Sequence, residues 1–284
     1  MQALDLHLGR PVHRGALTLF PVWNGGAVSR RGYDLRTNQL TVAERAGSPV
    51  VGELVATNTG PRPVLLLEGE LLEGGQQHRV AARTVVVPAQ GSVVLDVRCV
   101  EAGRWSGTDR HSRQGRRAPM RVRARSNRSQ QEVWDEVGRF GHAYGAGHTA
   151  SLLDATRSVE DTAAELVRDL RPLPFQSGVL VGIAGQPLLL EVFDSPRTLA
   201  HAWRQLLNAV AVDAVGLPAV PTPGRRARRF LDRLGSVEVT PGADAGAGRQ
   251  LLGASPYAEV AMTTWSDRVL HEVAVNPRHE LVHA

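Results

Sequence analysis

Apolar residues between Ala16 and Val100 occur in short runs bounded by glycine, proline and asparagine. Runs of this length that are rich in valine and leucine are typical of β-strands. The clearest are VVGELVATN, RPVLLLEGELLE, RVAARTVVV and SVVLDVRCV, and turn residues at Gly60-Pro61 and Gly74-Gly75 separate them. This pattern predicts an antiparallel sheet that forms part of a sandwich.

The pattern changes after residue 128, where helical spacing becomes common. RSQQEVWDEVGRF predicts a helix capped by Ser129, and SVEDTAAELVRDL a second helix capped by Ser158. SGVLVGIAGQPLLLEVF predicts a hairpin that turns near Gly185, and SPRTLAHAWRQLLNAVAVDAV a long helix. The basic helix RRARRFLDRL and two or three closing strands follow. The fold class is therefore α+β, with an N-terminal antiparallel β-rich half, sandwich-like, and a mixed half of helices and hairpins.

Between these halves the apolar pattern stops. From Arg104 to Arg128 nine arginines occur against one acidic residue, Asp109. We predict a loop here, and low order between Ser106 and Ser126, because like charges repel and few apolar residues anchor the segment. The expected organisation is a β-rich domain at 1–105, an Arg-rich loop at 106–128, and an α+β second half at 129–284 that packs on the first, as separate domains or as one continuous domain.

Composition narrows the functional classes. The chain of 284 residues is 42% hydrophobic and has a formal net charge of +5. Without a signal-like N-terminus or 18 consecutive apolar residues, it predicts a cytoplasmic protein that does not enter a membrane. All 33 basic residues are arginine, which excludes Schiff-base and phosphate-loop lysines. The single cysteine, Cys99, excludes an internal disulfide, and we expect it to be buried.

The candidate site begins at the hairpin around Gly74-Gly75. A two-residue turn there would place Glu70 opposite Arg79, because opposed residue numbers keep a constant sum in an antiparallel ladder. Side chains alternate between the faces of a strand, so Glu68, Glu70, Gln77 and Arg79 would project from one side. We expect four polar groups to converge on one surface.

A second polar group follows the strand SVVLDVRCVE. Glu101 continues the apolar face that includes Cys99, and Arg104 and Trp105 come directly after it. A planar cation beside a large ring suits a phosphate with a base or sugar. This pattern predicts one polar pocket formed by the 68–79 hairpin and the 99–105 segment. The alternative is a cross-strand Glu70–Arg79 ion pair, an exposed Glu101 and a Trp105 that packs in the core.

The same residues carry a family resemblance. The strings EGELLEGGQQHRV, VPAQGSVVLDVRCVEAGRW and GVLVGIAGQPLLLEVFDSPRTLAHAWRQLLNAVAVDA resemble the ARPP domain family, named for ADP-ribosylglycohydrolase and rhodanese-phosphatase associated protein. The resemblance spans roughly residues 16–214. Its motif positions correspond to Glu68, Glu70, Gly74, Gln77, Arg79, Cys99, Val100, Glu101, Gly103, Arg104 and Trp105. The resemblance implies a connection with ADP-ribose, NAD or phosphorylated-nucleotide metabolism, and it implies no known reaction.

Two functions follow as hypotheses. In the first, the pocket binds or processes a phosphorylated small molecule, with Glu70 and Glu101 as catalytic candidates. Its ligand-binding candidates are Glu68, Gln77, Arg79, Arg104 and Trp105. The alternative is a nucleic-acid-binding protein that acts through the basic segment Arg110–Arg128. Enzymatic activity, a bound metal, a cofactor and the oligomeric state stay open.

Overall fold

The computed structural model describes residues 5–25, 32–47, 49–145 and 150–283. It confirms the α+β class: the described residues form 17 strands and six helices, and the sheets are antiparallel. The chain divides into two compact units. Unit 1 contains the described residues of Met1–Arg31, Ala163–Asp244 and Gly248–Ala284, and unit 2 contains those of Gly32–Thr162 and Ala245–Ala247. The boundaries that we expected at residues 105 and 128 concern parts of the chain that would fold independently, and they stay a prediction.

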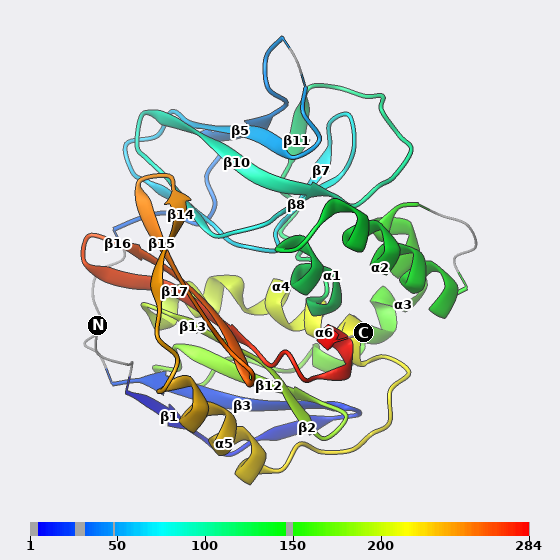
Figure 1. Cartoon of the computed structure of the whole chain (residues 1–284), viewed down its shortest axis with the longest axis vertical. Helices are drawn as coiled ribbons and strands as arrows, with labels where there is room; N and C mark the ends of the chain where they lie inside the picture. The colour runs from blue at the N-terminus through cyan, green and yellow to red at the C-terminus, as the bar shows by residue number, and fades with distance from the viewer. Residues whose placement is uncertain (1–4, 26–31, 48, 146–149, 284) are drawn as a thin grey trace. The chain divides into compact units, whose positions relative to one another are not determined.

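Unit 1 is built on one nine-stranded antiparallel sheet (Figure 1). The strand order is β1-β3-β12-β13-β17-β16-β15-β14, and β2 pairs with β3. Its strands are β1 (Leu6–Leu8), β2 (Val12–Arg14), β3 (Leu17–Asn24), β12 (Gly178–Ile183), β13 (Gln186–Phe193), β14 (Thr240–Ala245), β15 (Gly248–Ser255), β16 (Ala258–Trp265) and β17 (Arg268–Val275). The expected hairpin is confirmed, because β12 and β13 turn through Ala184 and Gly185, both with positive φ.

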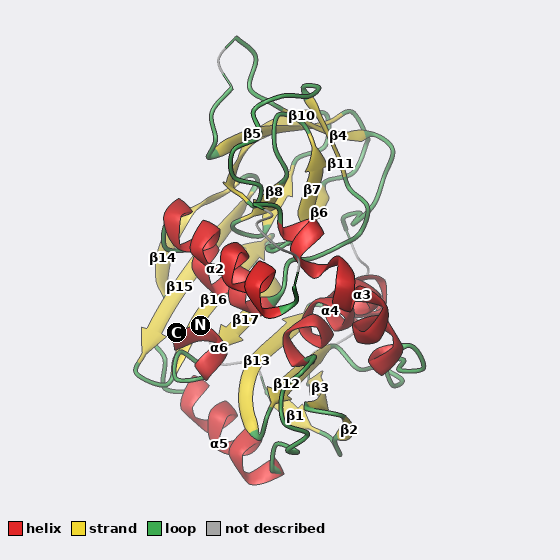
Figure 2. Cartoon of the chain, turned by 90° about the vertical axis from the view of Figure 1, so that its right-hand side faces the viewer, coloured by secondary structure: helices red, strands yellow, loops and turns green. Residues whose placement is uncertain are grey.

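Helices α4 (Pro196–Ala214) and α5 (Gly224–Leu234) cover this sheet, and α6 (Glu280–His283) closes the chain. Figure 2 shows α4 and α5 on opposite sides of β12 and β13. Ser195 caps α4 by accepting a hydrogen bond from the Thr198 N–H, as the serine-proline start predicts. Phe230 of α5 packs against apolar side chains of β3, β12, β13 and β16, so the arginines of this helix lie on its outer side.

Unit 2 contains a closed six-stranded barrel in place of the expected sandwich. Its strands in order are β10 (Gly91–Cys99), β5 (Glu53–Asn58), β4 (Leu40–Ala43), β11 (Arg110–Ser112), β7 (Leu71–Gly74) and β8 (Arg79–Ala81), and β8 pairs with β10 again. Strands β6 (Val64–Leu66) and β9 (Val85–Val87) form a separate pair. Leu95 and Val97 of β10 point into the apolar core, and Cys99 is fully buried, as the alternation predicts.

The helices of unit 2 are α1 (Met120–Ser126), α2 (Gln130–Ala143) and the first part of α3 (Leu152–Val167). The predicted cap of α2 is confirmed, since the Ser129 side chain accepts a hydrogen bond from the Glu132 N–H. The predicted cap of α3 is wrong. Ser158 lies inside that helix, and its hydroxyl donates to the Tyr144 carbonyl.

The run RPVLLLEGELLE does not form one strand. Gly69 has a φ of +78°, and both Gly69 and Glu70 bond to Ala81: the Gly69 N–H donates to the Ala81 carbonyl, and the Ala81 N–H donates to the Glu70 carbonyl. This is a β-bulge, with two residues opposite one. A Cβ at residue 69 would also lie 2.8 Å from Arg123 Cδ, so the position requires glycine.

The predicted register of the hairpin is also wrong. Leu72 pairs with Arg79 and Leu71 with Val80, so a wider turn separates β7 and β8. Two hydrogen bonds that involve side chains stabilise this turn. The Gly74 N–H donates to His78 Nδ1, and the His78 N–H donates to the Glu101 carboxylate. Glu70 therefore does not lie opposite Arg79.

Candidate functional site

Glu68 and Glu70 each bind arginines of the Arg-rich segment. Arg123 donates to both oxygens of Glu68, at 3.0 Å to Oε1 and 2.5 Å to Oε2, and Arg117 Nη2 lies 3.4 Å from Oε2. Arg113 makes a two-point contact with Glu70, at 2.7 and 3.0 Å. The bulge directs the two carboxylates to different partners, so they do not converge with Arg79 as the alternation predicts.

The segment expected to be a loop contains β11 and α1, and most of its charge is matched. Seven of the eight arginines between residues 110 and 128 lie within ion-pair distance of a glutamate. Arg121 and Arg125, four residues apart on α1, both face Glu136 of α2. Arg123 points from another face of the helix toward Glu68. The segment is therefore not a loop throughout, since β11 and α1 lie within it, and glutamates neutralise most of its arginines; its low order stays a prediction.

The other predicted residues meet at one end of the barrel, where β4, β8 and β10 end or begin. We call this group the Arg79 cluster: Glu44, Gln77, Arg79, Glu101, Arg104, Trp105 and His111. Five of these residues were predicted from the sequence, and Glu44 and His111 were not. Glu68 and Glu70 belong to the other ion pairs described above.

Glu101 and Arg104 form the outer part of the cluster. Arg104 donates to Glu101 Oε2 at 2.6 Å and to the carbonyls of Gly74 and Gly75, so it joins the turn to the segment after β10. Gln77 Nε2 donates to the Glu101 carbonyl at 3.0 Å. Burial by itself raises the pKa of the Glu101 carboxyl, but the hydrogen bonds from Arg104 and the His78 N–H outweigh it and hold the pKa below its ordinary value. Glu101 is therefore an ionised carboxylate at neutral pH.

Arg79 lies at the centre of the cluster and is fully buried. Its Nε donates to the Val51 carbonyl at 3.0 Å, and its Nη2 lies 4.0 Å from Glu44 Oε1. The Trp105 ring covers the guanidinium, with its centroid 5.7 Å from Arg79 Cζ, and Trp105 itself is 48% exposed. Burial lowers the pKa of the Arg79 guanidinium, which Cys99 and Glu44 oppose, and an arginine still carries its charge.

Four buried side-chain atoms, on three residues of this cluster, have no hydrogen-bond partner among the described residues: Arg79 Nη1, Arg79 Nη2, Glu44 Oε2 and Gln77 Oε1. An unsatisfied buried polar group costs about 1–3 kcal/mol, and more when it is charged. Native proteins seldom leave several of them together. Their proximity is therefore the strongest indication of a binding site in unit 2.

Glu44 and His111 are the residues that sequence reasoning missed. Glu44 directly follows β4, and His111 is the middle residue of β11, which pairs with β4 and β7. His111 Nε2 lies 3.1 Å from Glu44 Oε1, and both side chains are almost completely buried. Burial lowers the pKa of the His111 imidazole, and the hydrogen bonds to Glu44 and the Leu72 carbonyl oppose this. A three-residue strand among arginines has too little pattern to be found from sequence.

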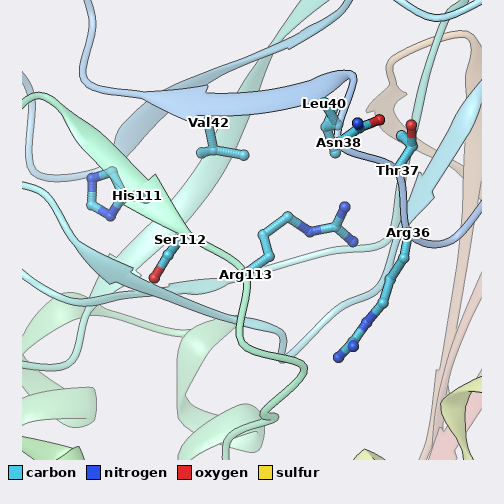
Figure 3. Close-up of a pocket in the computed structure, with 8 residues that line it drawn as sticks. All are labelled: Arg36, Thr37, Asn38, Leu40, Val42, His111, Ser112 and Arg113. Atoms are coloured by element: carbon cyan, nitrogen blue, oxygen red, sulfur yellow. The ribbon is translucent and has the colours of Figure 1, made fainter.

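A cavity of about 470 Å³ lies on the β4–β11 side of the barrel (Figure 3). It is lined by Arg36, Thr37, Asn38, Leu40, Val42, His111, Ser112 and Arg113. In Figure 3, His111 lies on β11, Arg113 follows the end of that strand, and Arg36, Thr37 and Asn38 come from the segment before β4. The cavity is therefore polar, and Glu70 matches the charge of Arg113 in its lining.

Within residues 5–25, 32–47, 49–145 and 150–283, no group of three or more histidine, cysteine or acidic side chains has the arrangement of a metal site. Among the described residues, every helix is too short or too polar to span a membrane.

The fold and the cluster define a class: an α+β protein in which a small antiparallel barrel holds a buried arginine among unsatisfied polar groups. The comparison with protein families then identifies the chain. Residues 5–275 match the model of the ARG and Rhodanese-Phosphatase-superfamily-associated Protein domain, ARPP-1, and the chain belongs to this family. No curated protein and no solved structure matches the chain.

Proposed function

We propose that the Arg79 cluster binds a phosphorylated nucleotide-like small molecule of the ADP-ribose or NAD type. The observation that carries this proposal is the fully buried Arg79 guanidinium, whose two terminal nitrogens have no hydrogen-bond partner among the described residues. Arginine in this state suits a phosphate, which accepts two parallel hydrogen bonds from it. The family description, which pairs this domain with ARG and rhodanese-phosphatase proteins, is consistent with such a ligand.

The remaining unsatisfied atoms narrow the ligand further. Glu44 Oε2 and Gln77 Oε1 are acceptors, whereas the Arg79 nitrogens are donors. A ligand that satisfies all of them carries an anionic group beside hydroxyl or amino groups. A ribose phosphate has this combination, and inorganic phosphate lacks the hydroxyl donors of a sugar.

Trp105 gives the ligand its second contact. Its ring is half exposed and covers the buried Arg79, so the ring must move aside for a phosphate to reach the guanidinium, and a base or sugar face can then stack on it. Arg104 and the ionised Glu101 hold the turn and the 99–105 segment together beside it. We assign Glu101 to this positioning and to contact with the ligand.

Glu68 and Glu70 have another role in this proposal. Their carboxylate oxygens already bind Arg113, Arg117 and Arg123. We assign these two glutamates to holding the Arg-rich segment against the barrel, and we use neither as a catalytic base.

The experiment is calorimetric titration of the full chain with ADP-ribose, NAD and inorganic pyrophosphate. The variants are Arg79→Met and Trp105→Ala. The matched control is Arg83→Met, because Arg83 pairs with Asp96 on the barrel and has no contact with the Arg79 cluster among the described residues. We expect ADP-ribose to bind, Arg79→Met to abolish binding, and Arg83→Met to bind as the unaltered chain does. Binding that survives Arg79→Met, or no binding of any of the three compounds, would refute the proposal.

A further inference from the structure

The two ring nitrogens of His111 both face hydrogen-bond acceptors. Nδ1 lies 3.2 Å from the Leu72 carbonyl oxygen, and Nε2 lies 3.1 Å from Glu44 Oε1. A carbonyl oxygen can only accept, so the first contact is a hydrogen bond only when Nδ1 carries a proton. The second contact then depends on a further proton.

Counting protons shows why. A neutral imidazole has one N–H, and an ionised carboxylate has none. With Nδ1–H used by Leu72, a neutral His111 beside an ionised Glu44 would place a nitrogen lone pair against a carboxylate oxygen. In the other neutral tautomer Nε2–H donates to Glu44, but Nδ1 then places its lone pair against the Leu72 carbonyl. Both contacts are therefore hydrogen bonds at once only if the pair holds one more proton, either as imidazolium with carboxylate or as neutral imidazole with carboxylic acid. Both forms contain the same number of protons, so the pair titrates as a unit.

The packing keeps this pair in place. The side chains of His111 and Glu44 are 0% and 3% exposed, so water has no access to relieve a repulsive contact between them. Gly75 lies against the imidazole, where a Cβ would be 2.1 Å from Nε2. The Gln76 N–H also donates to Glu44 Oε1, which fixes the carboxyl. Arg79 and His78 are the charged or titratable groups beside this pair, and Arg36 and Arg113 line the cavity next to His111. Cys99, Glu101 and Arg104 surround Arg79, and Glu70 pairs with Arg113.

We propose that Glu44 and His111 share one proton and that an anion bound at Arg79 is retained only while this proton is present. The inference rests on the proposed function for its ligand, and on hydrogen-bond geometry for its proton. Arg79 Nη2 lies 4.0 Å from Glu44 Oε1, so an anion on Arg79 adds negative charge next to the pair. Loss of the proton would leave that charge beside an ionised Glu44, in a site with little solvent to screen it.

This coupling has a measurable sign. Anion binding stabilises the protonated pair, so the protein takes up a proton when the ligand binds above the pH at which the pair titrates. Affinity for the anion then falls by up to about tenfold for each pH unit, the limit for one proton. Below that pH the pair is already protonated, so it contributes no pH dependence to the affinity.

The first test needs no ligand. Long-range proton–nitrogen NMR of the chain labelled at histidine nitrogen, with carbon NMR of the glutamate carboxyls, reports the protons on His111 and Glu44. The measurement runs from about pH 5 to 8, which extends below the ordinary histidine pKa because burial lowers the pKa of His111. We expect the two residues to titrate together, and Glu44→Gln to change the His111 signals. The matched control, Glu53→Gln, alters a half-buried glutamate that pairs with Arg45. A neutral His111 beside an ionised Glu44 throughout this range would overturn the inference.

The second test measures proton uptake with ADP-ribose. Calorimetric titrations in two buffers of different ionisation enthalpy, at several pH values, count the protons exchanged on binding. We expect up to one proton per ligand in the unaltered chain and in His7→Gln, a surface histidine control, and none in Glu44→Gln. Binding without proton uptake at any pH would overturn the coupling while leaving the proposed function intact. Absence of binding would refute the proposed function together with the coupling, and the NMR measurement would still decide the shared proton.

Discussion

Glu272 provides a quantitative test of the structure of unit 1. It lies on β17 between Val192 of β13 and Met262 of β16, on the sheet face that α5 covers. The residue is 4% exposed, and its Oε2 has no hydrogen-bond partner among the described residues. Burial raises the pKa of its carboxyl from 4.5 to about 7. The folded protein therefore binds this proton more tightly than the unfolded chain does.

The sign and size of the effect follow from linkage. Because the folded pKa is the higher one, the stabilisation from this proton is complete below about pH 4.5 and is lost as pH rises to about 7. The interval between 4.5 and about 7, at about 1.36 kcal/mol per pH unit, corresponds to about 3 kcal/mol. Glu272→Gln cannot ionise, so its stability relative to the unaltered chain should rise by about 2.5 kcal/mol between pH 5 and pH 8, because part of the change occurs below pH 5.

The assay is urea denaturation followed by circular dichroism at pH 5, 6, 7 and 8, for the unaltered chain, Glu272→Gln and the control Glu259→Gln. Glu259 lies on the neighbouring strand β16 and is exposed, so its substitution should leave the pH dependence unchanged. Comparing variants at each pH cancels the contributions of all other titrating groups. A difference in stability between Glu272→Gln and the unaltered chain that is the same at pH 5 and pH 8 would refute the reasoning.

Three further predictions concern unit 2. Glu68→Gln should lower the free energy of unfolding by about 3–5 kcal/mol, because it removes the charge opposite the fully buried Arg123, and urea denaturation measures this; a loss below about 1 kcal/mol would mean that the pair is solvated. Gly69→Ala should destabilise the same unit, since residue 69 has positive φ and a Cβ would meet Arg123; an unchanged melting temperature would contradict the bulge. Cys99 is fully buried, so a thiol reagent should modify it only after denaturation, and rapid reaction of the native protein would show the face of β10 to be wrong.

The pairing of arginines also bears on the nucleic-acid alternative. A phosphate-binding surface requires arginines that are exposed and free of carboxylates. Glu68, Glu70 and Glu136 neutralise most of those in the Arg-rich segment. The net charge of this segment in the sequence therefore overstates the positive charge that a polyanion would meet.

The sequence by itself determined the local elements. The Ser129 cap of α2, the serine-proline start of α4 and the turn of the β12–β13 hairpin are confirmed, and so is the burial of Cys99 by alternation along β10. Each depends on residues that are neighbours in the chain, because side-chain periodicity and capping act within a turn or a strand. These signals were sufficient for the α+β class.

Only the tertiary structure decided which charges meet. Glu68 binds Arg123, 55 residues away, and Glu44 binds His111, 67 residues away. Closure of the barrel brings β4 beside β11, and one bulge at Gly69 separates Glu68 from Glu70. Alternation of polar and apolar residues tells which face of a strand a side chain takes. It does not specify which strand lies next to it, because many pairings would bury the same apolar area. The partners of a buried charge are therefore fixed by the path of the chain.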